Sequence, residues 1–246
     1  LAKLSLWLFT LARELPFTFL DHSLRYGDSL VGLNVEQIKA FHWKPEQQMS
    51  FLEEEVNKAF DEVVSIRQEI HELAGDTTPE GQKLKSQRLF DANDATEKVR
   101  KIADVCVGAF FSEDKNKSRL DEKQRREDVV KTWLAGDVSA GDSIDRWVTT
   151  IRYEHSPFHW WIEFPEVFYG DRPDPISNGE KNGAAYMDGF VGNPPFLGGR
   201  KVSGAFGNSY SEWLATKHQC GKNANFCAHF FRVAWRLLGQ HGAGGF

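Results

Sequence analysis

The chain reads Tyr186-Met187-Asp188-Gly189-Phe190-Val191-Gly192-Asn193-Pro194-Pro195-Phe196-Leu197-Gly198-Gly199, and this stretch decides the expected fold. Residues 186–191 form a short, mainly apolar run, which is typical of a strand. The prolines and glycines that follow indicate that the strand ends in a loop. Ligand sites in open α/β sheets lie at the carboxyl ends of strands, so we predict a binding site directly after Val191.

The residues after this strand suit a flat ring that carries an amino group. The side-chain oxygen of Asn193 and the backbone carbonyl of Pro194 can together accept the two hydrogens of an exocyclic amine, which leaves the nitrogen lone pair free to attack. The two prolines would hold this carbonyl in place before a substrate arrives. The ring of Phe196 can stack on a base, a contact worth roughly 1–3 kcal/mol. An ordinary proline-rich turn after a buried strand is the alternative, and the four residues alone leave both interpretations open.

A glycine-spaced loop is predicted after the tetrapeptide, because glycines stand at positions 198, 199, 204 and 207. Such a loop could close over a base that has left its duplex. Arg200 and Lys201 are the candidates for contacts with phosphates of the nucleic acid.

Residues 184–207 resemble the catalytic motif of amino-group DNA methyltransferases, in particular the large adenine-specific enzymes of fused restriction-modification systems and related phage-defence systems. Three other segments are similar to motifs of the same family and occur in the family's order. Residues 2–8 resemble the helix after the strand that binds the cofactor ribose, and residues 19–32 the next cofactor-side strand and turn. Residues 158–168 resemble the segment just before the catalytic strand.

The resemblance implies a reaction and a set of site residues. The methyl group of S-adenosylmethionine would pass directly to the N6 amino group of an adenine flipped out of double-stranded DNA, without a covalent enzyme intermediate or a metal. The catalytic residues would be Asn193, Pro194, Pro195 and Phe196. Asp28 and Ser29 would bind the cofactor, with Asp28 accepting from its adenine amine. Without the resemblance, Asp28 is equally well interpreted as an ordinary turn aspartate.

The resemblance also implies the fold class: a partial Rossmann-like α/β core of S-adenosylmethionine-dependent methyltransferases with a helical insertion. Residues 1–36 and 151–246 would belong to the core, and residues 37–150 to the insertion. Between residues 46 and 134, apolar residues recur at helical spacing with charges on the opposite face, which predicts two or three antiparallel helices. A turn at residues 75–79 would end the first of them.

Two features of the family are missing from the printed sequence. One is the glycine-rich cofactor loop with its ribose-binding acidic residue, and the other is a DNA-recognition domain. We therefore expect the chain to be an internal piece of a longer protein that binds S-adenosylmethionine poorly by itself. A target-recognition domain and a fused or associated nuclease are the expected partners.

The composition indicates a folded protein that needs no membrane. With 246 residues, of which 41% are hydrophobic, the chain can bury a core. Charges and Pro16 interrupt the apolar N-terminal stretch too soon for a membrane helix, and the pattern of a signal peptide is lacking, so we expect a cytoplasmic location. Three cysteines favour a reducing compartment. The formal net charge of −5 implies that contacts with DNA would be local.

The remaining patterns favour structural roles. No metal site is expected, because Pro157 disfavours a helical pair of His155 and His159, and residues 218–229 lack the spacing of a zinc knuckle. Mixed charges between residues 113 and 128 favour a solvated helix face over a DNA contact. The predicted local structures are a linker at residues 136–145, an extended packing segment at 158–168, helices at 210–216 and 226–238, and a glycine turn at 241–245.

Two other classes of function stay open at this stage. The same tetrapeptide could bind a glutamine side chain of a protein or a base in RNA, because an amide nitrogen poses the same lone-pair problem. The chain could also be a non-catalytic interaction module with helices. A strand ending in a glycine-rich turn, encoded directly upstream, would favour the enzyme.

Overall fold

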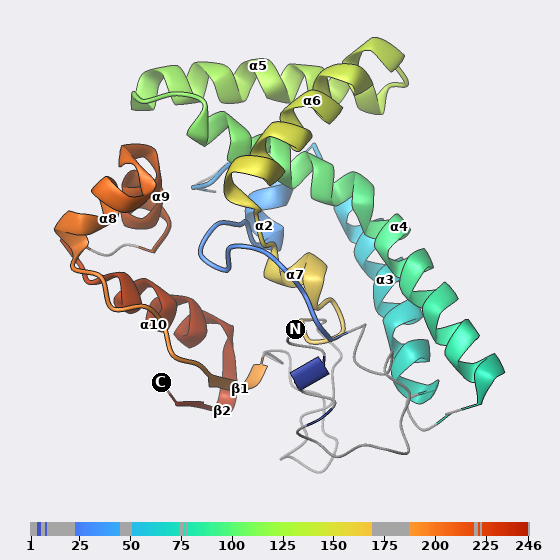
Figure 1. Ribbon diagram of the computed structural model, residues 1–246. Helices are drawn as coiled ribbons and strands as arrows, with labels where there is room; N and C mark the ends of the chain where they lie inside the picture. The colour runs from blue at the N-terminus through green and yellow to red at the C-terminus, as the bar shows by residue number, and fades with distance from the viewer. Residues whose placement is uncertain are drawn as a thin grey trace.

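The computed structural model describes residues 4, 5, 8, 23–44, 51–73, 76, 78–168, 187–218, 221 and 223–245. In Figure 1 the helices of residues 53–72 and 79–111 pack as a long hairpin, those of residues 116–134 and 138–155 lie across one end of it, and a smaller unit contains the strands. The helices are α2 (Val35–Lys39), α3 (Glu53–Glu72), α4 (Pro79–Phe111), α5 (Asn116–Leu134), α6 (Val138–His155), α7 (Trp160–Glu163), α8 (Gly199–Phe206), α9 (Asn208–His218) and α10 (Phe226–Leu237). The strands are β1 (Met187–Val191) and β2 (Leu238–Gly245). None of the helices in these ranges is long and apolar enough to cross a membrane.

The predicted Rossmann-like α/β core is wrong, because the described part of the chain is mostly helical and its sheet is small. β1 and β2 pair in parallel, with Met187 opposite Leu238 and Val191 opposite Gly245. The helices α8, α9 and α10 form the crossover that a parallel pair requires. A cofactor-side strand and turn was predicted at residues 19–32. Of these, residues 23–32 run as turns and irregular backbone with an isolated bridge between Asp28 and Pro157, and residues 19–22 lie outside the described residues. The described residues thus contain one strand-helix-strand unit near Asn193 where a partial Rossmann-like sheet is predicted.

The helical prediction for residues 46–134 is confirmed by α3, α4 and α5. α4 begins at Pro79, and the hydroxyl of Thr78 accepts a hydrogen bond from the Gly81 amide, which caps the helix. The predicted linker at residues 136–145 is mostly wrong, since α6 begins at Val138. The side chain of Asp137 caps α6 by accepting from the amides of the next turn.

The core surrounds the C-terminal half of α4, where residues 102–110 are all buried and, apart from Asp104 and Gly108, all apolar. The rings of Trp43 and Trp213 pack edge-on against Phe110, at centroid distances of 5.3 and 5.1 Å. Trp213 comes from α9, so this cluster joins the long helices to the unit that contains the strands.

Three other local predictions are corrected by the structure. Residues 158–168 include the short helix α7 and are not simply extended. The glycine-spaced loop after the tetrapeptide folds from Gly199 into α8, in which Gly204 is the one glycine beyond the first residue. The terminal glycines belong to β2 and not to a turn. The helices predicted at 210–216 and 226–238 are confirmed as α9 and α10.

The charged face of α5 differs most from expectation, because three of its basic residues are buried: Arg119, Lys123 and Arg126. Nε of Arg119 donates to the carbonyls of Phe110 and Glu113, at 2.9 and 2.7 Å, and so satisfies the C-terminal end of α4. Its guanidinium also lies 4.0 Å from the centroid of the Phe110 ring and forms an ion pair with Glu212 of α9 at 2.6 Å. Arg119 thus connects α4, α5 and α9.

We expect Arg119→Met to lower the free energy of unfolding by about 2 kcal/mol, because two carbonyls and a carboxylate lose their donor while the aliphatic part of the side chain is kept. Arg125→Met is the matched control on the same helix, since the Arg125 side chain is 57% exposed and its ion pair with Glu122 is worth less than about 1 kcal/mol. Urea unfolding of both variants measures the difference. Equal stability of the two variants would contradict the connecting role of Arg119.

Candidate functional site

The tetrapeptide lies at the carboxyl end of β1, where the sequence predicts a site. The pairing with β2 continues one residue beyond the strand, because the Gly192 amide donates to the Gly245 carbonyl at 3.1 Å. Asn193 is exposed and Pro194 is buried. The chain is held again at Leu197, whose carbonyl accepts from the Phe226 amide at the start of α10, at 2.8 Å. Residues 192–197 are therefore fixed at both ends.

Gly199 explains why the chain can turn into α8 at this point. A Cβ atom at this position would lie 2.4 Å from the carbonyl oxygen of Ala224, closer than side chains tolerate. The backbone of α8 can thus approach the segment before α10 only with glycine here. This close approach positions the tetrapeptide against α10.

A cavity of about 260 Å³ lies beside the tetrapeptide. Its volume is close to the lower end of the range for small-molecule sites, roughly 300 Å³, and it suits one flat ring. The cavity is lined by Ser29, Trp160, Phe190, Val191, Gly192, Asn193, Pro194, Pro195, Phe230, Val233 and Ala234. The structure therefore brings Ser29 together with three of the four predicted catalytic residues.

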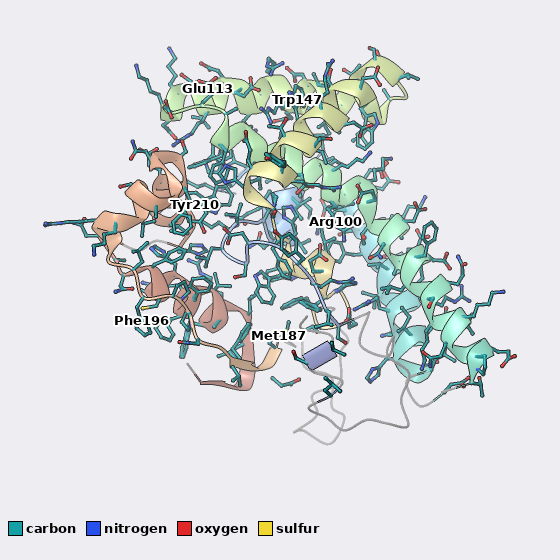
Figure 2. The ribbon with its side chains drawn as sticks, viewed as in Figure 1. Arg100, Glu113, Trp147, Met187, Phe196 and Tyr210 are labelled. Atoms are coloured by element: carbon teal, nitrogen blue, oxygen red, sulfur yellow. The ribbon has the colours of Figure 1, made fainter. Side chains whose placement is uncertain are left out.

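Phe196 lies outside this group. Its side chain is 76% exposed and does not line the cavity, and Figure 2 shows it on the outer side of the loop near α10. The aromatic surface of the cavity comes instead from Trp160, Phe190 and Phe230. Trp160 meets Phe190 edge-on, with a centroid distance of 5.7 Å. Sequence reasoning assigned Trp160 to packing alone; its place in the segment before the catalytic strand was the available signal.

Asp28 is held within the protein and lines neither this cavity nor its neighbour. Its carboxylate accepts from the Leu30 amide at 2.9 Å, as in an Asx turn, and from the Tyr210 hydroxyl at 2.7 Å. Burial raises the pKa of Asp28, and the hydrogen bonds from Tyr210 and Leu30 oppose that rise. This geometry matches the interpretation of Asp28 as a turn aspartate. The residue fixes the segment 28–33, which we call the site loop.

Side chains of α7, of the residue just before α7 and of α9 hold the site loop. The indole of Trp160 donates to the Ser29 carbonyl at 3.1 Å, and that of Trp213 donates to the Leu30 carbonyl at 2.9 Å. The Leu33 amide donates to Nδ1 of His159 at 3.0 Å. Gly32 passes so close to the Phe158 carbonyl oxygen that a Cβ atom would lie 2.0 Å from it. The site loop is thus held by hydrogen bonds from α9 on one side and by the segment 158–160 on the other.

A buried hydrogen-bond chain connects the site loop to α4. Because Nδ1 of His159 accepts from Leu33, the ring proton must lie on Nε2, which donates to Asp104 at 3.0 Å. The second carboxylate oxygen of Asp104 accepts from Arg152 of α6 at 2.7 Å. His159 and Asp104 are each 1% exposed. Sequence reasoning considered His159 only as a metal ligand and missed this role.

A second cavity, of about 270 Å³, adjoins the first. The residues that line both are Ser29, Trp160 and Val233. The second cavity is bounded by the site loop, α7, α9 and α10, and it contains the side chains of Lys217 and Arg236. Ser29 thus stands between two neighbouring spaces, which is the arrangement that a transfer between two bound molecules needs.

Arg200 and Lys201 are exposed in the first turn of α8, just after the tetrapeptide. This turn has no acidic residue, so two cations lie where the helix dipole is positive. The two cations and the positive end of the helix dipole repel one another, and an anion bound at this turn would reduce that repulsion.

Within the described ranges, no group of three or more His, Cys, Asp or Glu side chains could hold a metal ion. His155 stacks on Phe111 at a centroid distance of 3.9 Å, while His159 is engaged with Asp104. Burial lowers the pKa of His155 and of His229. Cys220, which belongs to the Cys and His residues of the segment 218–229, lies outside the described residues.

Comparison of the chain with protein-family models, with curated proteins and with solved structures returned no match. The function must therefore be argued from the chemistry of the two cavities.

Proposed function

We propose that the protein methylates the N6 amino group of adenine in DNA and takes the methyl group from S-adenosylmethionine. The observation that supports this most is the ring-sized cavity at the end of β1, with Asn193 and Pro194 in a wall that is otherwise mainly apolar. Such a wall removes water from the faces of a base. The side-chain oxygen of Asn193 and the backbone carbonyl of Pro194 would still accept the hydrogens of the base's amine.

Adenine suits this arrangement because the lone pair of its amine is delocalised into the ring. Acceptance of both amine hydrogens by Asn193 and Pro194 would stabilise a tetrahedral nitrogen in the transition state. The proline ring fixes the local backbone, so the carbonyl needs little reorganisation. The base must leave the duplex to enter. Leaving the duplex costs the free energy of unstacking and unpairing the base. A stacking contact with Trp160, Phe190 or Phe230 would offset roughly 1–3 kcal/mol of it.

We assign the methyl donor to the neighbouring cavity. S-adenosylmethionine supplies an electrophilic methyl group when bound, and it combines an aromatic base, a cationic sulfonium and a carboxylate. Rings of Trp160 and Trp161 in the cavity wall suit the first two, because they offer stacking and cation–π contacts. Ser29 borders both spaces, so it is the better of the two predicted cofactor residues, and Asp28 acts by holding the site loop.

Contacts with DNA are proposed around α8. Arg200 and Lys201 lie beside the tetrapeptide, and their positive charges can bind phosphate. Because the chain has a formal net charge of −5, such contacts must come from local basic residues of this kind. The setting we propose is a restriction-modification or phage-defence system with a target-recognition domain and a nuclease as partners. A cytoplasmic location is in keeping with a DNA substrate.

Base-resolved mapping of modified DNA tests the proposal. We expect cells that express the full gene to contain N6-methyladenine at one short sequence motif, and cells without the gene to lack it there. Methylated glutamine or methylated RNA without any change in DNA would instead favour the alternative substrates. No new methylation in DNA, RNA or protein would contradict an enzymatic role.

A further inference from the structure

One indole ring stands between the two cavities. Three of the described residues line both of them, and Trp160 is the aromatic one of the three. Its ring meets Phe190 edge-on at a centroid distance of 5.7 Å and Phe158 edge-on at 4.9 Å. Phe190 belongs to the wall beside Asn193, and Phe158 belongs to the wall of the second cavity. Trp160 therefore contacts one ring from each wall.

A hydrogen bond ties the same indole to the site loop. Nε1 of Trp160 donates to the Ser29 carbonyl at 3.1 Å, and Ser29 also lines both cavities. Trp160 is half-buried and is the first residue of α7, a helix of four residues. Because one rigid ring forms part of both walls, any rotation of the indole about this hydrogen bond changes the shape of both cavities at once.

A shared wall links the ligands on its two sides. A planar ring that packs on the indole from the second cavity restricts the rotation of the indole. A base that enters beside Asn193 then meets a stacking surface that is already oriented, so its binding costs less conformational entropy. The effect is reciprocal, because each ligand must change the affinity of the other by the same factor. Two ligands bound on either side of Trp160 should thus bind cooperatively.

We propose that Trp160 is a positioning residue that couples the two cavities: S-adenosylmethionine in the second cavity orients the indole on which a base stacks beside Asn193. The identity of the two ligands rests on the proposed function. The coupling adds an order of events to the site, because the bound methyl donor prepares the first cavity and raises its affinity for the base. Coupling between two sites of one protein is typically about 5- to 150-fold in affinity.

Fluorescence of 2-aminopurine, a flat base with an exocyclic amine, tests the coupling in the protein expressed from the full gene. Stacking on an indole quenches this fluorescence, so the signal reports the contact that we infer for Trp160. We expect quenching on binding, and an affinity at least about fivefold higher with saturating S-adenosylmethionine than without it. Trp160→Leu should remove most of the quenching and the effect of S-adenosylmethionine on affinity, because the shared ring is lost.

Trp160→Phe and Trp235→Leu complete the experiment. Phenylalanine keeps a ring but cannot donate to Ser29, so Trp160→Phe should bind the base with a smaller effect of S-adenosylmethionine. Trp235 is 80% exposed and lines neither cavity, so Trp235→Leu should behave like the original protein in both measurements.

Three results would overturn the proposal: failure of either probe to bind, equal affinity for 2-aminopurine with and without S-adenosylmethionine, or a full effect of S-adenosylmethionine in Trp160→Leu. If Trp160→Leu melts at a lower temperature than the original protein, a full effect in Trp160→Phe overturns the proposal instead. Mapping of modified DNA separates this inference from the proposed function. N6-methyladenine without coupled binding removes the coupling alone, and coupled binding without methylation of DNA removes the proposed reaction alone.

Discussion

Asn193→Ala is expected to lower the rate of DNA adenine methylation by at least about a hundredfold, the usual effect of removing one preorganised polar group that acts in the transition state. In the proposed mechanism the side-chain amide would accept one amine hydrogen, and Pro194 alone would not hold the nitrogen in a tetrahedral geometry. Binding of a ligand in the second cavity should be unaffected, since Asn193 does not line it. The loss should therefore appear in kcat and not in cofactor affinity.

Measurement of N6-methyladenine in DNA from cells that express each variant of the full gene gives the readout. Asn208→Ala is the matched control, because Asn208 is the exposed first residue of α9 and lines neither cavity. Thermal melting should show both variants to be as stable as the original protein, since both asparagines are exposed. Methylation by Asn193→Ala at the original rate would remove the support for the proposed function.

The parts of the fold that were predictable depend on local pattern. Helices α3, α4 and α5 are predicted by the spacing of their apolar residues and by capping residues such as Thr78. Strand β1 is predicted by a short apolar run before two prolines. The wider sheet could not be judged in this way. Whether residues 19–32 pair as a strand depends on partners, and in their described part, residues 23–32, the side chains of Trp160, Trp213 and Tyr210 satisfy polar groups of the segment.

The candidate site was predictable only where one segment supplies it. Asn193 and Pro194 follow directly from the tetrapeptide, and their cavity lies where the strand ends. Trp160 and Phe230 come from segments distant in sequence, and no local spacing relates them to Asn193. The burial of Arg119 could not be predicted from the sequence either. A basic residue among acidic ones gives the same sequence pattern whether its side chain lies in solvent or donates to the carbonyls at the end of α4.

Asp104→Ala is expected to lower the free energy of unfolding by about 4 kcal/mol, the largest stability effect that we predict. The substitution leaves the buried Nε2 proton of His159 without an acceptor and removes one of the ion pairs of Arg152. Loss of one partner from a buried, hydrogen-bonded charge pair typically costs roughly 3–5 kcal/mol. Asp104→Asn should cost less, because an amide oxygen still accepts from His159. Urea unfolding provides the comparison.

The same variant distinguishes a purely structural network from one that also positions the site. His159 holds the site loop through the Leu33 amide, and a neutral amide oxygen is a weaker acceptor for the His159 ring proton than a carboxylate. Asp104→Asn should therefore increase hydrogen exchange at Leu33 even where global stability is nearly retained. Glu97→Gln is the matched control, since Glu97 also binds Arg152 but is half-exposed and does not contact His159. Faster exchange at Leu33 in Asp104→Asn alone would show that α4 fixes the loop bordering both cavities. Unchanged exchange in both variants would instead mean that Trp160 and Trp213 suffice to hold it.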